Sequence, residues 1–233
     1  MRLKQLAKRS FRSLGVEVGK YKKRTTPLVT LDFDLLLDVG ANKGQYALNA
    51  RAAGFSKRIV SFEPLSAAHA ILTTMAKSDD AWQIHERTAI GSRNGEAEIN
   101  IAGNSYSSSL LPMLPAVTAA QPNTAYVGKE VTKVSTLDSV FEKYRVGQER
   151  VYLKIDAQGY EKHVLEGAED CLSSIDGVEI ELALVPQYGS QELYEYFFSY
   201  FKQAGFELWS ISPGFSNQQT GRLMEFDAVF IRS

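Results

Sequence analysis

The chain has 233 residues, of which 44% are hydrophobic; it can fill the core of one domain, and no apolar run approaches the roughly 20 residues of a membrane span. Its single cysteine excludes a disulfide framework and a cysteine-based zinc site, and with the lack of a secretory signal it predicts a cytoplasmic location. The net charge of −1 conceals an asymmetry: residues 1–24 carry nine Lys and Arg side chains and one acid, which leaves the remainder acidic and a poor general binder of nucleic acid.

Residues 1–24 form a basic segment that we separate from one domain over residues 25–233. Within it, residues 2–14 combine an apolar stripe at helical spacing (Leu3, Leu6, Ala7, Phe11, Leu14) with a basic row (Lys4, Lys8, Arg12). One interpretation is a surface helix that contacts anionic lipid or a polyanionic glycan, and a second is a terminal helix that packs its stripe on the domain. An RNA-contacting arm is a third, and these interpretations stay open.

The stretch from Leu35 to Tyr46 predicts a nucleotide-binding turn. A short apolar run, typical of a strand buried on both faces, breaks at Gly40 and opens a helix at about Lys43. Glycine allows a sharp turn and a close approach to a ligand, and the N–H groups that begin a helix can bind a negative group. The spacing is Asp-x-Gly-x-x-x-Gly, which fits neither the G-x-G-x-x-G dinucleotide fingerprint nor the Walker loop.

A second strand over residues 58–64 ends in an acid. Glu63 follows Gly40 at close to the spacing at which a carboxylate accepts hydrogen bonds from a ribose. Pro64 has no N–H for a strand ladder and ends the strand, and a helix follows over residues 66–77. We therefore interpret Glu63 as a ribose ligand rather than as a cap for that helix.

The middle of the chain predicts strands and a long irregular segment. Residues 82–90 fit a third strand, and an alternating strand follows over residues 96–101 after a turn. Residues 103–128 are rich in Ser, Pro and Asn and lack periodicity, which is typical of a lid or a mobile loop. The next expected elements are a short strand over 130–134 and a helix over 136–144.

Residues 151–161 are a second informative stretch. Apolar residues lie on one face of a strand while Lys154 and Asp156 lie on the other, and burying these charges is costly unless they are paired or functional. Gly159 then allows a tight turn into a helix over residues 160–167. Structural ion pairing could explain both charges, but ligands bind at the carboxyl ends of parallel strands, so we favour an active-site role.

The rest of the chain alternates again. The expected elements are a strand over 178–184, a helix over 191–204 with core aromatic residues, and strands over 205–209 and 225–231. This alternation predicts a doubly wound, mainly parallel α/β sheet, and the last two strands predict an antiparallel hairpin at its edge.

Three motifs now stand in order along the chain. They are Leu36–Tyr46, Ser61-Phe62-Glu63-Pro64 and Leu153–Glu161 with Leu165-Glu166-Gly167-Ala168 behind it, and Ser108-Ser109-Leu110 and Thr136-Leu137-Asp138 lie between them. This combination resembles the FkbM family of class I S-adenosylmethionine-dependent methyltransferases over about residues 35–232. The resemblance implies a Rossmann-like, mainly parallel seven-stranded fold, S-adenosyl-L-methionine as the methyl donor, and O-methylation of a sugar, glycan or small metabolite. Gln158 is a departure, because glutamate is the more usual residue there.

The resemblance also implies a set of site residues. The donor-binding set is Asp38, Gly40, Ala41, Asn42, Gly44, Tyr46, Glu63, Pro64, Thr88, Ala89, Asp156 and Gln158. Residues 40–44 would surround the methionine part of the donor, Glu63 would take the ribose hydroxyls, and Thr88 and Ala89 would lie beside the adenine. Asp156 and Gln158 would face the sulfonium. We expect the acceptor to meet Ser108, Ser109 and Glu181, although the serines could instead merely keep their loop soluble.

Methyl transfer by in-line attack is helped by a base that removes the acceptor's proton. Asp156 is the first candidate for this base, and His163, in the following helix, is the second. Lys154 could keep Asp156 ionised, or act as a base itself if it is desolvated. The scattered histidines give no metal site, although a divalent ion could bridge Asp156 and Glu181 to the acceptor.

The acceptor is the least determined part of the prediction. Asp156-Ala157-Gln158-Gly159 lacks the Asp/Asn-Pro-Pro-aromatic pattern of nucleobase amino methyltransferases. Methylation of a pyrimidine at C5 needs a nucleophilic cysteine, and the single cysteine, Cys171, falls beyond the helix. A hydroxyl acceptor is therefore favoured over nucleic acid. The alternatives are an RNA or protein methyltransferase that uses the basic segment, and a non-catalytic donor-binding module. A peripheral membrane contact through residues 2–14 stays open, and the oligomeric state is not predicted.

Overall fold

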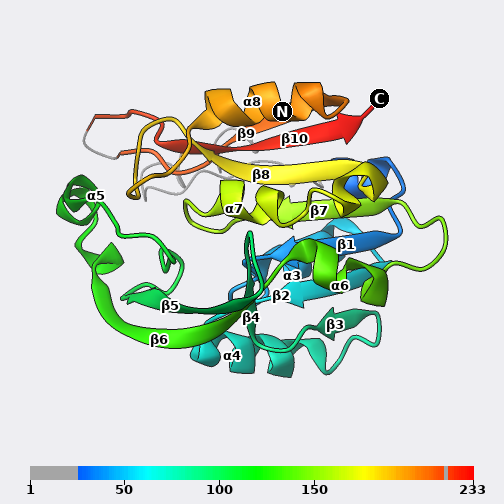
Figure 1. Ribbon diagram of the computed structural model, residues 1–233, viewed down its shortest axis with the longest axis horizontal. Helices are drawn as coiled ribbons and strands as arrows, with labels where there is room; N and C mark the ends of the chain where they lie inside the picture. Colours follow the sequence, from blue (N-terminus) through cyan, green and yellow to red (C-terminus); the bar gives the residue numbers. More distant parts are fainter. Residues whose placement is uncertain (1–25, 218–219) are drawn as a thin grey trace, which may run out of the picture.

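The computed structural model describes residues 26–217 and 220–233, and Figure 1 shows the arrangement of its elements. The predictions for residues 2–14, and for the whole segment 1–24, lie outside the described residues. None of the helices within the described part of the chain has the length and apolar character that crossing a bilayer requires.

Seven strands form the central sheet. In order across it they are β3 (Trp82–Ile84), β2 (Arg58–Phe62), β1 (Leu35–Val39), β7 (Val151–Ile155), β8 (Gly177–Ala183), β10 (Glu225–Arg232) and β9 (Phe206–Pro213). The first five run parallel, and β10 is antiparallel to both of its neighbours. The predicted mainly parallel seven-stranded sheet with an antiparallel C-terminal hairpin is confirmed.

Helices cover both faces of this sheet (Figure 1). One face packs against α2 (Pro27–Thr30), α3 (Gln45–Ala53) and α4 (Ser66–Ala76), and the other against α6 (Leu137–Tyr144), α7 (Glu161–Glu166) and α8 (Tyr194–Gln203). Strand β1 shows why its sequence begins as an apolar run: Leu36 packs in the core of the first face, and Leu35 and Leu37 pack in the core of the second. Successive side chains of a strand alternate between faces, so a doubly covered strand favours apolar residues on both of them, and the buried Asp38 is the exception in β1.

A second, three-stranded sheet was not expected from the sequence. It contains β4 (Thr88–Ile90), β6 (Tyr126–Ser135) and β5 (Gly95–Ala102) in that order. The prediction of one strand over residues 82–90 is therefore wrong, because β3 belongs to the central sheet and β4 to the small one. The chain changes sheet at residues 85–87, where the Arg87 guanidinium donates to the carbonyl oxygens of Pro64 and Val131.

The interpretation of residues 103–128 as one irregular segment is also partly wrong. The segment contains α5 (Pro115–Ala120), a 3₁₀ turn η1 (Pro122–Thr124) and the first residues of β6, and a second 3₁₀ turn, η2 (Cys171–Ser174), follows later in the chain. Strand β6 is ten residues long rather than five, because it pairs along its length with β5. Its first half is largely exposed, so it carries none of the apolar alternation by which a strand is found in a sequence.

Candidate active site

A cavity of about 260 Å³ lies at the carboxyl ends of the central parallel strands. Its lining comprises Val39, Gly40 and Asn42 after β1, Phe62 to Leu65 after β2, Thr88 to Ile90 of β4, Ile99 of β5, residues 105–110, Asp156 to Gln158 after β7, and Tyr160, Glu181 and Glu225. This edge of a doubly wound sheet is where such folds bind ligands. Among the described residues, the lining contains four carboxylate side chains and no Lys or Arg.

The glycine turn after β1 has a structural reason beyond ligand approach. Gly40 has φ +78°, and a Cβ there would stand 1.8 Å from the carbonyl oxygen of Asp156, at the end of the neighbouring strand. Gly44 has φ +93°, and a Cβ there would stand 2.6 Å from the Trp82 ring. Gly44 caps α3, which begins at Gln45, slightly later than predicted. Both glycines therefore allow the chain to pack closely, and Gly40 also lines the cavity.

Glu63 fixes the turn after β1 from the end of β2. Its Oε2 accepts a hydrogen bond from the Asn42 N–H at 2.7 Å, and its Oε1 accepts one from the Leu65 N–H at 2.8 Å. Burial raises the pKa of Glu63 to about 7, although both N–H donors act to lower it. Each carboxylate oxygen has a second acceptor position, so Glu63 can hold the turn and still accept hydrogen bonds from ligand hydroxyls.

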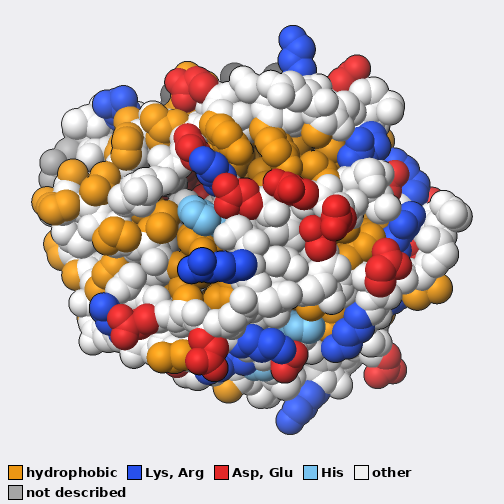
Figure 2. Space-filling view, viewed as in Figure 1, with side chains coloured by type: hydrophobic (Ala, Val, Ile, Leu, Met, Phe, Trp, Pro, Cys, Tyr) orange, Lys and Arg blue, Asp and Glu red, His pale blue; other side chains and the backbone are white. Residues whose placement is uncertain are grey.

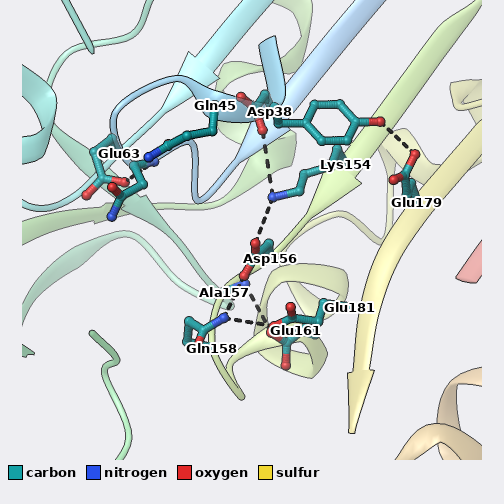
Figure 3. Close-up of polar contacts among 12 residues, drawn as sticks. Asp38, Gln45, Glu63, Lys154, Asp156, Ala157, Gln158, Glu161, Glu179 and Glu181 are labelled. Atoms are coloured by element: carbon teal, nitrogen blue, oxygen red, sulfur yellow. Dashed lines mark hydrogen bonds and ion pairs between the residues drawn. The ribbon is translucent and has the colours of Figure 1, made fainter. Parts of the chain in front are cut away.

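A buried lysine stands behind Asp156 (Figure 3). The Lys154 Nζ lies 3.1 Å from Asp156 Oδ2 and 4.0 Å from Oδ1 of Asp38, which is fully buried. Burial acts to lower the pKa of Lys154, but the carboxylates of Asp156 and Asp38 outweigh it and raise the pKa above its ordinary value. Burial raises the pKa of Asp38 to about 6, against the opposing effect of Lys154. Lys154 therefore carries a permanent positive charge behind the cavity.

Gln158 joins two carboxylates at the other side of the cavity. Its Nε2 donates to Asp156 Oδ1 and to Glu181 Oε2, both at 2.8 Å, and its Oε1 accepts from the Tyr188 hydroxyl at 2.8 Å. Burial, and then the charge of Asp156, raise the pKa of Glu181 well above its ordinary value. Burial also raises the pKa of Glu225, which accepts a hydrogen bond from Gln187.

Residues 104–110, here called the strap, connect the two sides of the cavity. Near one end the Asn42 Nδ2 donates to the Ser105 carbonyl oxygen at 3.3 Å, and at the other the Ser109 hydroxyl donates to the Gln158 carbonyl oxygen at 2.7 Å. The strap thus contacts both the turn after β1 and the turn after β7, and its serine residues are part of the cavity lining.

The structure brings most of the predicted site residues together. Those that line the cavity are Gly40, Asn42, Glu63, Pro64, Thr88, Ala89, Asp156, Gln158, Ser108, Ser109 and Glu181. Those outside its lining are Asp38, Ala41, Gly44, Tyr46, Lys154 and His163. The Tyr46 hydroxyl, for example, donates a hydrogen bond to Glu179 Oε2 at 2.6 Å. The second group lies behind the cavity wall, where it shapes the site without facing it.

Two candidate bases are not supported by their positions. Lys154 lies behind Asp156 and stays protonated, so of its two predicted roles the geometry favours pairing with Asp156 over acting as a base. His163 stacks on Tyr160, with their ring centroids 4.0 Å apart, and does not line the cavity. Asp156 is the candidate that reaches the cavity. In the part of the chain that the structure describes, no group of three or more His, Cys, Asp or Glu side chains could hold a metal ion.

Sequence reasoning missed several residues of the site. Tyr188 and Glu225 come from chain segments that carried no motif, and only the fold places them beside Gln158 and Glu181. Glu161 accepts hydrogen bonds from the N–H groups of Ala157 and Gly159, and so holds the turn after β7. An acid two residues after Gly159, separated from it by Tyr160, could have indicated this last role.

The strand order, the doubly covered sheet and the cavity at its carboxyl edge define the class I methyltransferase fold. A family model described as Methyltransferase FkbM domain matches residues 38–208. The chain belongs to this family.

Solved structures with similar folds share little sequence with the chain. An uncharacterized protein from Listeria monocytogenes has a TM-score of 0.49 and 7% identity, with 86% of this chain covered and 62% of that one, so this chain spans less than two thirds of it. Fibrillarin from Aeropyrum pernix, solved with S-adenosyl-L-methionine, has a TM-score of 0.48 and 10% identity, with 88% and 69% covered. Sp1610 from Streptococcus pneumoniae, a putative tRNA methyltransferase solved with the same compound, has a TM-score of 0.47 and 8% identity, with 87% and 67% covered. No curated protein matches the chain.

Proposed function

We propose that the protein is an S-adenosyl-L-methionine-dependent O-methyltransferase that acts on a hydroxyl of a sugar, glycan or small polyhydroxylated metabolite. One observation carries the proposal: a single cavity holds Glu63 after β2 and Asp156 after β7, within a lining that has four carboxylates and no Lys or Arg. Family membership supports the methyl-transfer chemistry, and the cavity supports the nature of the two ligands.

The donor side of the cavity suits a nucleoside. Glu63 has free acceptor positions for two ribose hydroxyls, and Thr88, Ala89 and Ile90 form a largely apolar wall on which a base can lie. The donor supplies a methyl group on a positively charged sulfur. The neighbouring carboxylate of Asp156 favours that charge, because Asp156 lines the same cavity.

The acceptor side suits hydroxyl groups. Carboxylates of Asp156, Glu181 and Glu225 accept hydrogen bonds from hydroxyls, and the strap adds serine hydroxyls that donate or accept. In the proposed reaction the acceptor oxygen attacks the methyl carbon in line, its O–H bond breaks, and the proton passes to Asp156. The ion pair with Lys154, at 3.1 Å, holds the Asp156 carboxylate in place to take this proton. The bond between the methyl carbon and the sulfur breaks, and the products are the methyl ether of the acceptor and the neutral thioether.

A phosphate-bearing acceptor such as RNA fits this cavity poorly. Four carboxylates without a lining Lys or Arg repel phosphate. On the face seen in Figure 2, acidic and basic side chains are interspersed and no single large basic patch is visible. RNA binding through the basic segment 1–24 is the competing function, and it would be lost on deletion of that segment and weakened by salt.

The test is calorimetric titration of S-adenosyl-L-methionine into the protein, followed by turnover with a panel of sugars, glycans and polyols. We expect Glu63→Ala to weaken donor binding at least tenfold, and Asp156→Asn to bind donor but lose about 10²-fold or more of turnover. Because the Glu63 pKa is about 7, donor affinity of the unmodified protein should rise as the pH increases from 6 to 8.

Either half of the proposal can fail separately. Absence of donor binding in the unmodified protein would refute the donor site. Full turnover by Asp156→Asn would remove Asp156 as the base. Donor binding without turnover on the panel, together with methylation of RNA, would replace the sugar acceptor by the competing one.

A further inference from the structure

Gln158 has a backbone conformation that demands an explanation. It has φ +52°, and Gly159 after it has φ +91°, so two successive residues are left-handed. Residues other than glycine rarely adopt this conformation, and they keep it where the surrounding contacts determine it. Gly159 is required here because a Cβ would stand 2.8 Å from the Tyr188 ring. The turn therefore presses Gln158 against the end of β7 and against the segment that carries Tyr188.

The contacts of the Gln158 amide fix its orientation. Figure 3 shows its side chain between the carboxylates of Asp156 and Glu181. An amide nitrogen has two donor hydrogens, and both are used, one on each carboxylate at 2.8 Å. The amide oxygen accepts from Tyr188, whose hydroxyl is also 3.2 Å from the Ser107 carbonyl oxygen in the strap. A flipped amide would place its oxygen against two carboxylates, so only one orientation is stable.

This arrangement separates two acids that would otherwise repel each other. Within residues 26–217 and 220–233, Gln158 provides the one side-chain hydrogen bond made to Glu181, and it shares Asp156 with Lys154. An amide can donate to both carboxylates at once, whereas an ionised glutamate at position 158 could donate to neither. The amide thus holds two carboxyl groups side by side in one wall of the cavity.

We propose that Gln158 is a positioning residue: it holds Asp156 in its proton-accepting orientation, holds Glu181 beside it, and couples both to the strap through Tyr188 and its own carbonyl oxygen. The proposal deepens the proposed function and rests on it for the role of Asp156. Removing the amide should favour the protonated forms of the two carboxylates, because each loses a donor to its charged form.

The surroundings of Asp156 contain further charges that any measurement of pH dependence must include. The titratable groups that interact with it are Lys154 on its own strand, Asp38 of β1, Glu63 after β2, Glu161 of α7, Glu181 of β8, and Glu225 and Asp227 of β10. All of these remain in a Gln158→Leu variant, so a change in pH dependence reports the loss of the amide.

The experiment compares the unmodified protein with Gln158→Leu by two readouts. The first is the pH dependence of kcat/KM with an acceptor found on the panel, whose acid limb should move up by about one to two pH units, the effect of losing one hydrogen bond to a charged group. The second is infrared difference spectroscopy of the protonated carboxyl band over the same pH range, assigned with Asp156→Asn and Glu181→Gln. It needs no acceptor, so it tests Gln158 even if no panel compound is methylated.

Gln45→Leu is the matched control, because the Gln45 Nε2 donates to the Tyr106 hydroxyl in the strap and Gln45 does not line the cavity. We expect it to leave both pH transitions where they are. Tyr188→Phe should shift them in the same direction as Gln158→Leu but by less, and the double variant should show less than the sum of the two shifts. The proposal would be overturned if the carboxyl transitions were unchanged in Gln158→Leu. It would also be overturned if this variant lost turnover through KM alone and kept the same pH profile.

Discussion

Glu161→Gln should change the free energy of unfolding in a pH-dependent way. Relative to the unmodified protein, the variant should be more stable at high pH than it is at low pH. Glu161 is 2% exposed, and its Oε1 accepts hydrogen bonds from the N–H groups of Ala157 at 3.0 Å and Gly159 at 3.1 Å. A glutamine oxygen can accept the same two bonds without carrying a charge. The substitution therefore keeps the turn after β7 and removes a buried ionisable group.

The magnitude follows from the shift of the Glu161 pKa. Burial raises this pKa from 4.5 to about 7, while the two backbone N–H groups act to lower it. Between these values the folded state binds more protons than the unfolded state, so the free energy of unfolding falls as the pH rises. A shift of about 2.5 pH units corresponds to about 3.4 kcal/mol when the transition is complete above pH 7. We expect about 1–3 kcal/mol, because the neighbouring carboxylates also titrate in this window.

Urea denaturation at pH 4.5 and at pH 8.5 measures this difference. The quantity compared is the change in unfolding free energy on substitution at each pH, so any pH-independent effect of the new amide cancels. Glu96→Gln, at an exposed position, is the control and should show the same effect at both pH values. A Glu161→Gln variant that is equally or more destabilised at pH 8.5 than at pH 4.5 would refute the reasoning.

Two further predictions concern the strands that meet beneath the cavity. Gly40→Ala should lower the free energy of unfolding by about 3 kcal/mol or more in urea denaturation, because the new Cβ meets the Asp156 carbonyl oxygen in a left-handed turn. Gly128→Ala, where the nearest atom would be 3.8 Å away, should cost far less, and equal costs would contradict the clash. Lys154→Met should cost about 3–5 kcal/mol at pH 8, since it leaves buried Asp38 without a cation. The cost should shrink at pH 5, below the Asp38 pKa of about 6, and a cost independent of pH would show that Asp38 does not depend on Lys154.

The elements that could be predicted from the sequence are those whose signals are local. Strand β1 is recognisable because a strand buried on both faces is mostly apolar, as Leu35 to Leu37 are, and the glycine turn follows it directly. Lys154 stands out because it breaks that pattern within β7, and Asp156 stands out because it follows the end of this strand directly. Glu63 could be located because parallel strands of one sheet end at the same edge, so the spacing from Gly40 to Glu63 carries spatial information.

The features that could not be predicted depend on contacts between distant segments. Strand β6 follows its long pairing with β5 rather than any periodicity of its own, and β3 and β4 separate because they pair with different partners. Motif position places a residue near a site but does not say which way its side chain points. Tyr46 and Gly44 accordingly belong to the glycine motif and still lie behind the cavity.

Buried acids gather around the carboxyl ends of the central strands, and they indicate a ligand-binding role more than a contribution to the stability of the fold. Burial raises the pKa values of Asp38, Glu63, Glu161 and Asp227 above the usual range for carboxyl groups, so each of them opposes folding at neutral pH. Among the described residues, Lys154 forms its ion pairs with Asp38 and Asp156, and it does not pair with the other acids. A stable fold would avoid this concentration of acids, and apolar residues of similar size would serve the core as well. Under the proposed function, the acceptor's hydroxyl groups and the donor's positively charged sulfur would supply hydrogen bonds and charge to the carboxylates that line the cavity, Glu63 among them.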